Sequence, residues 1–416
     1  MKILMISPRY SNEAGDGIYT NSLSLALVKM GIQISVFTII NGMYAFLKYS
    51  KESDSDAKSN KPECFTLGKT KNGTLSLNFY SNNARKSLRT TLKATKPDCI
   101  HIHGIHQYFT LSCLFELEQY GAPIMITAHD YKILCGNSGF FSDRTNEPCI
   151  KCLDGKLYHP IFEKCKKKSL IKSFGVFAQM SLWKYFNGLG SVNYFHAGSQ
   201  FVANILTQND SLKNKIKYVR FPFLIQELGS KANTEICIAF IGRFVSHKGL
   251  RIFAEAIKYF NITTHVFGEG SESYIAENLL KTKSSIILHG WKKYSEIYQI
   301  LGKGSIVVVP YLSYETFCYV IVEAMMNGCC VVATNRGAIP ELIQNGYNGV
   351  LVDPPTPENF RTAIEKLLAN PERIYSIGHQ AKNINKTLPS LNEHAHGIVK
   401  IYSLMVEEQN NKDFKR

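Results

Sequence analysis

The chain has 416 residues, of which 45% are hydrophobic, and a formal net charge of +15 at pH 7. This length favours two domains, each large enough to bury a core of its own. No apolar run approaches the roughly 20 residues that span a bilayer, so the composition excludes a membrane-spanning class.

Positive charge is concentrated in the first half of the chain. Residues 1–225 hold 28 Lys and Arg against 15 Asp and Glu, whereas residues 226–416 hold 20 against 18. Such asymmetry indicates the kind of partner and not the fold. It favours an anionic lipid surface or an anionic acceptor for the first half. Nucleic acid is a weaker alternative, because the cations are not interleaved with exposed aromatic residues along the predicted strands.

The first elements in the chain are a strand, a glycine loop and a helix. The apolar run after Lys2 ends at Pro8 with no cleavage site, which indicates a strand and not a signal peptide. Gly15 and Gly17 precede a helix with an apolar face, and the N-terminus of such a helix suits an anion or a sugar. The A-G-D-G spacing is not G-x-G-x-x-G, so it does not predict a dinucleotide fingerprint.

Histidines stand at the ends of two later strands. The run PDCIHIHGIHQYF carries His101, His103 and His106, which we interpret as lining a cleft. A metal site is the alternative, but His101 and His103 share one strand face and a glycine then breaks the spacing. The run PIMITAHDYKILC delivers His129 and Asp130 to the same edge of the sheet, where open α/β proteins bind ligands.

Four of the eleven cysteines have the spacing C-x13-C-x2-C-x12-C: Cys135, Cys149, Cys152 and Cys165. An odd number of cysteines without a signal peptide favours a reducing compartment. In that setting a C-x2-C pair flanked by two more cysteines predicts a structural zinc site. A metal could hold together this polar, Gly- and Pro-rich segment, which is too thin for a core of its own. Ordinary reduced cysteines are the alternative.

Residues 163–186 join lysines to an aromatic-rich helix. Five lysines come before six large apolar residues, in the order Lys164, Lys166, Lys167, Lys168, Lys172, Phe174, Phe177, Met180, Leu182, Trp183 and Phe186. Cations beside such a helix suit the surface of an anionic membrane, at roughly 1 kcal/mol per cation. A core helix with a solvated, charged start is the alternative.

The two halves join in residues 215–235, and a buried strand follows. That strand breaks at Gly242, and Arg243 and Lys248 lie on the loop into the next helix. Two cations fixed in a site of low dielectric stabilise the charge that grows on a departing diphosphate. We expect them to face a carboxylate loop across a crevice; exposed surface cations are the alternative.

Two more strands stop at glycines, Gly268 and Gly290, each before a helix. Ordinary turns at strand ends would explain both glycines. A ligand pocket at the carboxyl edge of the sheet would explain them equally well.

The most informative stretch runs from the buried strand at residues 306–309 into the following helix. Pro310 cannot continue a central strand, so the loop after it lies at the carboxyl edge of the sheet. Glu315 lies in this loop and Glu323 in the helix. The helix is predicted to begin at Tyr319 or Val320, and N–H groups at its start point at a bound anion. Two solvated helix glutamates are the alternative.

These motifs together resemble the retaining glycosyltransferases of family 4. The resemblance is carried by the E-x7-E pair Glu315 and Glu323, the G-R-x4-K-G run at 242–249, and the T-x-H-D run that ends in Asp130. The HDYKILC stretch with its later C-x2-C is similar to a polysaccharide-building subgroup of that family. The resemblance covers nearly the whole chain and is most specific over residues 236–353.

The resemblance implies the GT-B fold, an α/β architecture of two Rossmann-like domains that face each other across a cleft. We expect an acceptor-side domain at residues 1–220, with the cysteine-rich insertion at about 135–165. A donor-binding domain is expected at residues 221–390. The helix predicted in residues 391–416 would pack back on the first domain.

The resemblance also implies a role for each motif residue. Arg243 and Lys248 hold the donor diphosphate, Glu323 holds the ribose, and Glu315 and His129 orient the donor sugar. Further donor-binding positions are the glycine turns and the helix start: Gly15, Gly17, Gly268, Phe317, Cys318, Tyr319 and Val320. The family has glycine where this chain has Cys318, and a side chain there is harmless if φ stays negative.

The expected activity is retaining, metal-independent transfer of a sugar from a nucleotide-diphosphate donor. The acceptor is a glycan or a lipid-linked glycan in surface polysaccharide synthesis, and the expected place is the cytoplasmic face of the membrane. No cofactor is expected for catalysis. Another nucleotide-sugar enzyme of the same architecture, such as an epimerase or a hydrolase, is the nearer alternative. A basic nucleic-acid-binding protein is the more distant one.

Overall fold

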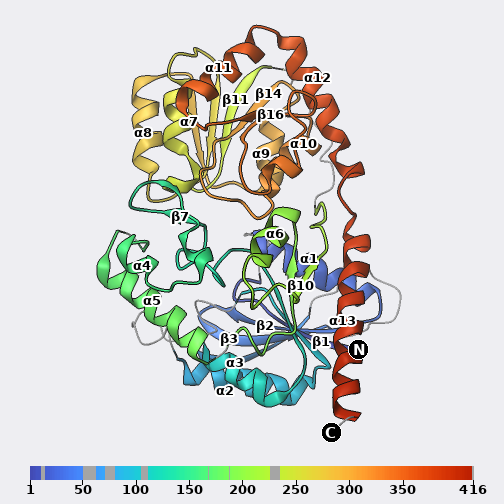
Figure 1. Cartoon of the computed structure of the whole chain (residues 1–416). Coiled ribbons are helices and arrows are strands. Elements are labelled where there is room, and N and C mark those ends of the chain that lie inside the picture. Colours follow the sequence, from blue (N-terminus) through green and yellow to red (C-terminus); the bar gives the residue numbers. More distant parts are fainter. Residues whose placement is uncertain are drawn as a thin grey trace.

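The computed structural model describes residues 1–10, 15–49, 62–70, 80–104, 111–166, 168–186, 188–224 and 235–414. They form two α/β domains, one above the other in Figure 1, with a long C-terminal helix running down the side of the first, lower domain. His106 and the polar stretch at 51–61 lie outside the described residues.

The first domain is built on an eight-stranded sheet of order β10-β9-β6-β5-β1-β2-β3-β4. Six strands run parallel, and β3 and β4 add an antiparallel edge. The strands are β1 Lys2–Ile6, β2 Gln33–Ile40, β3 Met43–Lys48, β4 Glu63–Lys69, β5 Cys99–Ile102, β6 Ile124–Thr127, β9 Tyr194–Ala197 and β10 Ile216–Tyr218. β5 and β6 are buried over their whole length, as expected of parallel strands covered on both faces.

Helices cover this sheet and begin at conventional caps. They are α1 Gly15–Lys29, α2 Asn82–Thr95, α3 Leu111–Tyr120 and α6 Gln200–Thr207. The hydroxyls of Ser81 and Ser199 accept the third N–H of α2 and α6, which satisfies donors that the first helical turn leaves free.

The cysteine-rich insertion leaves the first domain after β6 and extends toward the second domain (Figure 1). It contains β7 Phe141–Ser142, β8 Glu147–Pro148, a 3-10 helix Lys151–Asp154, α4 His159–Phe162 and α5 Leu170–Tyr185. The carboxylate of Glu163 binds both Arg144, at 2.9 Å, and Lys151, which ties the end of α4 to the β7–β8 turn and to the 3-10 helix.

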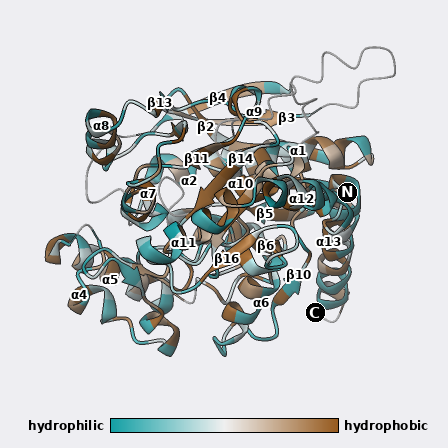
Figure 2. Ribbon diagram, turned by 90° about the horizontal axis from the view of Figure 1, so that it is seen from above, coloured by the Kyte–Doolittle hydropathy of each residue, from teal (hydrophilic) through white to brown (hydrophobic). Residues whose placement is uncertain are grey.

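The second domain is a six-stranded, fully parallel sheet of order β13-β12-β11-β14-β15-β16. Its strands are β11 Cys237–Ile241, β12 Thr264–Phe267, β13 Ile286–Gly290, β14 Ser305–Val309, β15 Cys330–Thr334 and β16 Val350–Val352. Its helices are α7 Leu250–Ile257, α8 Ser273–Thr282, α9 Tyr294–Ile300, α10 Tyr319–Met326, α11 Pro357–Leu368 and α12 Pro371–Ala381. Every residue of the central strands β11 and β14 is buried, and both strands have the hydrophobic colour in Figure 2.

The register of this sheet positions the site. Ile238 of β11 lies opposite Ile306 of β14, so the two strands end level with each other. The loops that begin at Gly242 and Pro310 therefore leave the same edge of the sheet. Both loops face the first domain.

The last helix, α13 Leu391–Phe414, returns to the first domain. Its Tyr402 hydroxyl lies 2.6 Å from Nδ1 of His101, and Nε2 of His394 lies 2.7 Å from the Tyr19 hydroxyl. A second link joins the domains directly, because the Glu341 carboxylate accepts the first N–H groups of α6, from Gln200 and Phe201. No helix within the described ranges has the length and apolar character needed to cross a membrane.

Candidate active site

Two glycines let the loops at the sheet edge approach each other closely. Gly249 has φ +71°, and a Cβ there would lie 2.0 Å from the carbonyl oxygen of Pro310. Gly268 has φ +136°, and its Cβ would lie 1.9 Å from the carbonyl oxygen of Gly242. Only glycine combines this backbone conformation with this close approach. The ends of β11, β12 and β14 thus converge on one small region.

Lys248 and Glu315 are in direct contact in that region. Nζ of Lys248 lies 2.9 Å from Oε1 of Glu315, and the Ser313 hydroxyl donates to the same oxygen at 3.2 Å. The two side chains are only 15% and 18% exposed, so water screens the pair weakly. Nζ also lies 3.9 Å from the centre of the Tyr311 ring.

Tyr311 lies among all four of the charged residues that the motifs single out. Burial raises its pKa, the carboxylates of Glu315 and Glu323 raise it further, and the Arg243 guanidinium opposes them. The hydroxyl of Tyr311 donates to the carbonyl of Ile241 at 2.7 Å, which holds the ring under the loop. The four charged residues therefore cluster around the Tyr311 ring. They all belong to the second domain, so the cations do not face the carboxylates across the cleft as the motifs suggested.

Glu323 lies deeper than Glu315, inside α10. Burial raises the pKa of Glu323 to about 7. Its charge also adds to the effect of burial on Tyr298 and Tyr319, raising the pKa of both phenols. The hydroxyl oxygens of these two tyrosines are buried and have no hydrogen-bond partner among the described residues. An unpaired buried polar atom costs about 1–3 kcal/mol, so hydroxyl groups of a ligand would be stabilising here.

The start of α10 offers backbone N–H donors beside the charged cluster around Tyr311. The helix begins at Tyr319, as the sequence predicted. In the described part of the chain, no backbone acceptor is found for the N–H groups of residues 317–320. Positive charge of the helix dipole adds to these donors.

The residue before α10 departs from expectation. Cys318 has φ +73° and ψ +67°, a left-handed conformation, so the condition that φ stays negative is not met. A side chain in this conformation costs roughly 1–2 kcal/mol, which glycine would avoid. The thiol is buried, at 7% exposure, and packs into the core of the second domain.

His129 approaches the charged cluster around Tyr311 from the first domain. Its carbonyl accepts the Thr316 hydroxyl at 3.1 Å, next to Glu315 in the chain. Burial lowers the pKa of His129 to about 4, and the opposing effect of the Asp16 charge shows that the start of α1 is near. Gly15 and Gly17 were expected to precede this helix, but they lie within its first turn. The imidazole is therefore neutral at pH 7 and can both donate and accept a hydrogen bond.

Phe221 connects the two sides, and no sequence motif pointed to it. Its ring stacks on His129, with centroids 5.7 Å apart and planes at 5°. On the other side it contacts Phe317 at 5.5 Å and Tyr319 at 6.3 Å. Phe221 lies in the stretch that we interpreted only as a domain join. Its partners are far away in the chain, so nothing local in the sequence marks it.

Comparisons with known proteins bear on the fold and on the second domain. Residues 224–384, which cover the second domain, match the family model for glycosyl transferases group 1. The solved structure of Anabaena HepE in complex with UDP-glucose has a TM-score of 0.65 and 17% identity, covering 97% of this chain and 99% of that one. At that identity the likeness shows the fold, and the predicted GT-B class is confirmed. The chain thus has the GT-B fold, and its second domain matches the glycosyl transferases group 1 model.

Two relatives from Methanocaldococcus jannaschii show how far the similarity extends. One uncharacterized glycosyltransferase is 33% identical over 168 residues, which cover 39% of this chain and 46% of that protein. The chain therefore spans less than half the length of this relative. A second uncharacterized glycosyltransferase is 23% identical over 422 aligned positions and covers 98% of this chain and 99% of its own.

Other residues that the sequence analysis singled out lie at the ends of β12, β13 and β6. Gly268 is at the end of β12, and the N–H of Trp291, just after Gly290, bonds Oε1 of Glu269 at 3.3 Å. Oδ1 of Asp130 accepts the N–H of Lys132 at 2.8 Å, a bond that shapes the turn after His129.

The strand-end histidines form a hydrogen-bonded cluster. His101 bonds Thr127 and Tyr402, both at 2.6 Å. His103 lies 3.2 Å from His129 through Nδ1, whereas its buried Nε2 has no partner in the described ranges. Burial lowers the pKa of His101 and of His103, so both are neutral.

The four cysteines of the insertion lie near one another as free thiols. A hydrogen bond with Cys152 lowers the pKa of Cys135 to about 7, and it raises that of Cys152. Burial, with the charges of Cys135 and Cys149, raises the pKa of Cys165 to about 12. Nevertheless, no three His, Cys, Asp or Glu side chains among the residues described form a group that could hold a metal ion. The zinc site stays a prediction.

Proposed function

We propose that the protein transfers a sugar, with retention at the anomeric carbon, from a nucleoside-diphosphate donor to a glycan or lipid-linked glycan. The observation that carries this proposal is the cluster of charged side chains around Tyr311. It combines the Lys248–Glu315 pair, the raised pKa of Glu323 and the free N–H groups at the start of α10. A cationic end and a carboxylate end suit the two halves of a nucleotide sugar.

In the proposed complex, the donor diphosphate lies against Arg243, Lys248 and the start of α10. The ribose lies on Glu323 and the hydroxyls of Tyr298 and Tyr319. The UDP-glucose of the solved HepE complex is a donor of the required kind.

In the proposed reaction, the bond between C1 of the sugar and the diphosphate oxygen breaks. The acceptor hydroxyl attacks C1 from the face that the diphosphate leaves, and its proton passes to a diphosphate oxygen. Glu315 and the neutral His129 orient the sugar hydroxyls from opposite sides. Fixed cations stabilise the charge on the leaving group, so the proposal needs no metal ion for catalysis.

The acceptor side of the proposal rests on the first domain. Large apolar side chains are exposed on α4 and α5, among them Phe162 at 70% and Ile171 at 76%. Lys164, Lys168 and Lys172 are exposed beside them. Only Ser173 and Val176 of α5 are buried, so α5 is a surface helix. This surface favours peripheral attachment to the inner face of an anionic membrane, where surface polysaccharides are assembled on lipid carriers.

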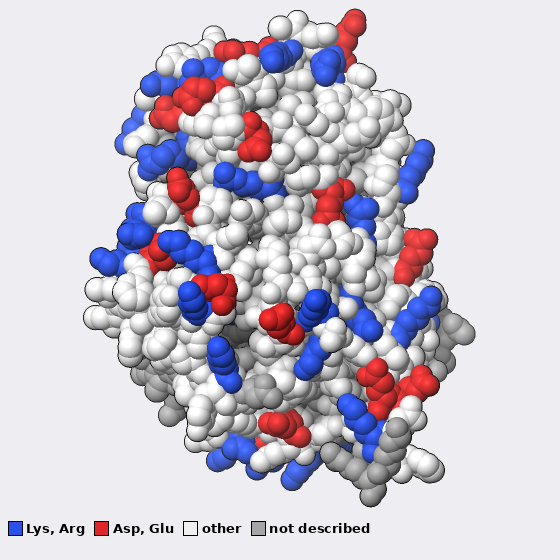
Figure 3. Space-filling model, viewed as in Figure 1, with Lys and Arg blue, Asp and Glu red and all other residues white. Residues whose placement is uncertain are grey.

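The charge on the face shown in Figure 3 is mixed. Lys and Arg side chains alternate there with Asp and Glu over both domains. The membrane proposal therefore depends on the exposed residues of α4 and α5, and not on a broad basic patch. Such local basic and apolar character also does not favour the nucleic-acid alternative.

Product analysis tests the proposed reaction. The purified protein is incubated with radiolabelled UDP-, GDP- and ADP-sugars, with and without a membrane extract as acceptor source. Transfer predicts label in acceptor only when the extract is present, and no new free sugar without it. Release of free sugar without acceptor would indicate a hydrolase, and a changed sugar on intact nucleotide would indicate an epimerase.

A further inference from the structure

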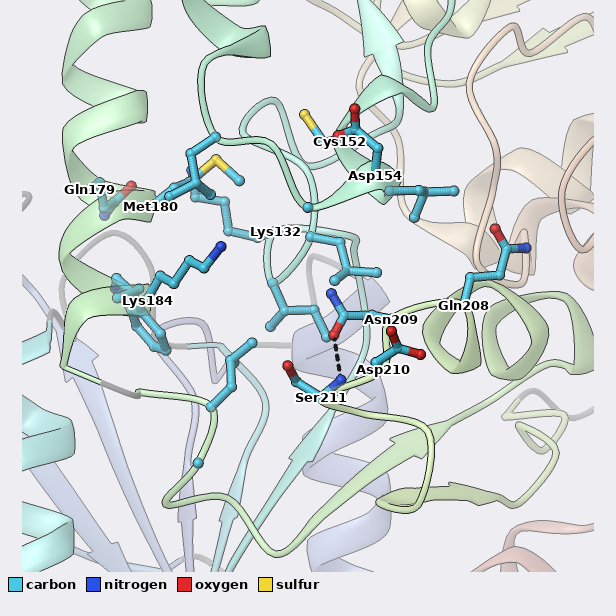
Figure 4. A pocket seen from close by; sticks show the side chains of 18 residues that line it. Lys132, Cys152, Asp154, Gln179, Met180, Lys184, Gln208, Asn209, Asp210 and Ser211 are labelled. Atoms are coloured by element: carbon cyan, nitrogen blue, oxygen red, sulfur yellow. Dashed lines mark hydrogen bonds between the residues drawn. The ribbon is translucent and has the colours of Figure 1, made fainter.

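The first domain has a hollow, separate from the donor site. Its volume is about 380 Å³, and all the residues that line it precede residue 212. In Figure 4, Gln179, Met180 and Lys184 project into it from α5, Asn209, Asp210 and Ser211 face them from the turn after α6, and Cys152 and Asp154 of the insertion close a third side. Its size lies in the range of small-molecule sites, roughly 300–1,000 Å³.

The hollow is lined mainly by apolar side chains. They are contributed by the segment after β6, the insertion and α5: Ile133, Leu134, Leu153, Leu157, Met180 and Trp183. Against this apolar part of the lining, a sugar would leave its hydroxyls without partners. An alkyl or prenyl chain would gain roughly 25 cal/mol for each Å² that it removes from water.

Two lysines make the hollow amphipathic. Lys132 and Lys184 both line it, and Nζ of Lys132 donates to the carbonyl of Gly136 at 3.0 Å. Burial and the nearby Lys166 ammonium lower the pKa of Lys132 to about 8, so an anion close by would stabilise its charge. Of the two acids in the lining, Asp154 is engaged by His159, at 2.8 Å, and Asp210 is the other.

The hollow is also next to the proposed reaction site. Lys132 follows His129 by three residues, and the hydroxyl of the intervening Tyr131 lies 3.5 Å from the carbonyl oxygen of Glu315. A molecule held on Lys132 would therefore lie close to the cleft in which the sugar is transferred.

We propose that this hollow binds the phosphorylated end of an apolar chain, with phosphate on Lys132 and Lys184 and the chain along Trp183, Met180 and the leucines. This inference rests on the proposed function, because it makes the hollow the anchor for the lipid-phosphate part of the acceptor. It assigns a task to the cysteine-rich insertion, which forms one wall.

Tryptophan fluorescence tests the proposal directly. The chain has two tryptophans, Trp183 in the hollow and Trp291 beyond β13. In the Trp291→Phe protein, Trp183 is the only reporter. Octyl phosphate below its micelle concentration is expected to change this fluorescence saturably. Octanol (chain alone) and inorganic phosphate (anion alone) are each expected to bind at least about tenfold more weakly, or about 1.4 kcal/mol.

Two variants of the same helix separate specific from general charge effects. Lys184→Met is expected to weaken octyl phosphate by about tenfold and to leave octanol unchanged. Lys172→Met is the matched control, since Lys172 is exposed on α5 but does not line the hollow. It is expected to change nothing.

Equal responses to all three probes, no saturable response, or equal effects of the two variants would overturn the proposal. The proposed function is read separately, from stabilisation of the wild-type protein by nucleotide sugars. A protein that binds nucleotide sugars but not octyl phosphate would refute this inference alone.

Discussion

Replacing Lys248 with methionine tests the cationic end of the charged cluster around Tyr311. The ammonium lies 2.9 Å from Glu315 and 3.9 Å from the Tyr311 ring, at 15% exposure. Methionine keeps the length and apolar character of the side chain and removes the charge. The loss of one fixed group that stabilises a growing negative charge is typically worth about 10²- to 10³-fold in turnover. We expect at least a tenfold fall in kcat/KM, about 1.4 kcal/mol.

The same change is expected to reduce stability to a moderate extent. The pair is neither fully exposed nor fully buried, so its loss should cost between about 1 and 3 kcal/mol. Initial rates of sugar transfer and urea melts of the free protein measure the two effects independently. Lys281→Met is the matched control, because Lys281 is exposed on α8. Turnover of Lys248→Met equal to that of Lys281→Met would refute the role given to Lys248.

Three further predictions concern other parts of the site. The pKa of Glu323 is about 7 in the folded protein against an ordinary value of 4.5, so the unfolded chain releases this proton first as pH rises. Glu323→Gln should therefore match the wild type in unfolding free energy near pH 4 and exceed it by up to about 3 kcal/mol at pH 8. A difference that stays constant between pH 4 and pH 8 would contradict the raised pKa of the buried Glu323 carboxyl. Cys318→Gly is expected to keep turnover and Tm. Cys318→Val should lower the free energy of unfolding by more than about 1 kcal/mol, because a branched side chain suits φ +73° least. Equal melting temperatures for the two variants would contradict this prediction. Flotation with anionic liposomes should carry the protein at low salt, and Ile171→Glu should abolish it; flotation of the variant equal to wild type would remove α5 from membrane binding.

The local frame of the site could be predicted from the sequence. The strand β14, its end at Pro310 and the start of α10 at Tyr319 follow from an apolar run, a proline and the next apolar run. Gly249 and Gly268 could be recognised as turn residues, because each lies between an apolar strand run and the next helix. The GT-B class came from the resemblance carried by these motifs.

The contacts between segments could not be predicted in this way. Lys248 and Glu315 are 67 positions apart, and they meet only because β11 pairs with β14 in a register that levels their ends. Phe221 and Tyr311 acquire their importance from partners in other elements. The left-handed φ of Cys318 reflects the tight approach at the start of α10, which the residue type itself would not suggest.

Binding of nucleotide sugars tests the central claim most directly. We expect at least one of the UDP-, GDP- and ADP-sugars to stabilise the wild-type protein, by about 2.7 kcal/mol at a concentration one hundred times its Kd. The Arg243→Ala, Lys248→Met double variant should lose this stabilisation while remaining folded. If no nucleotide sugar stabilises the protein, or if the double variant is stabilised equally, the charged cluster around Tyr311 is not the donor site.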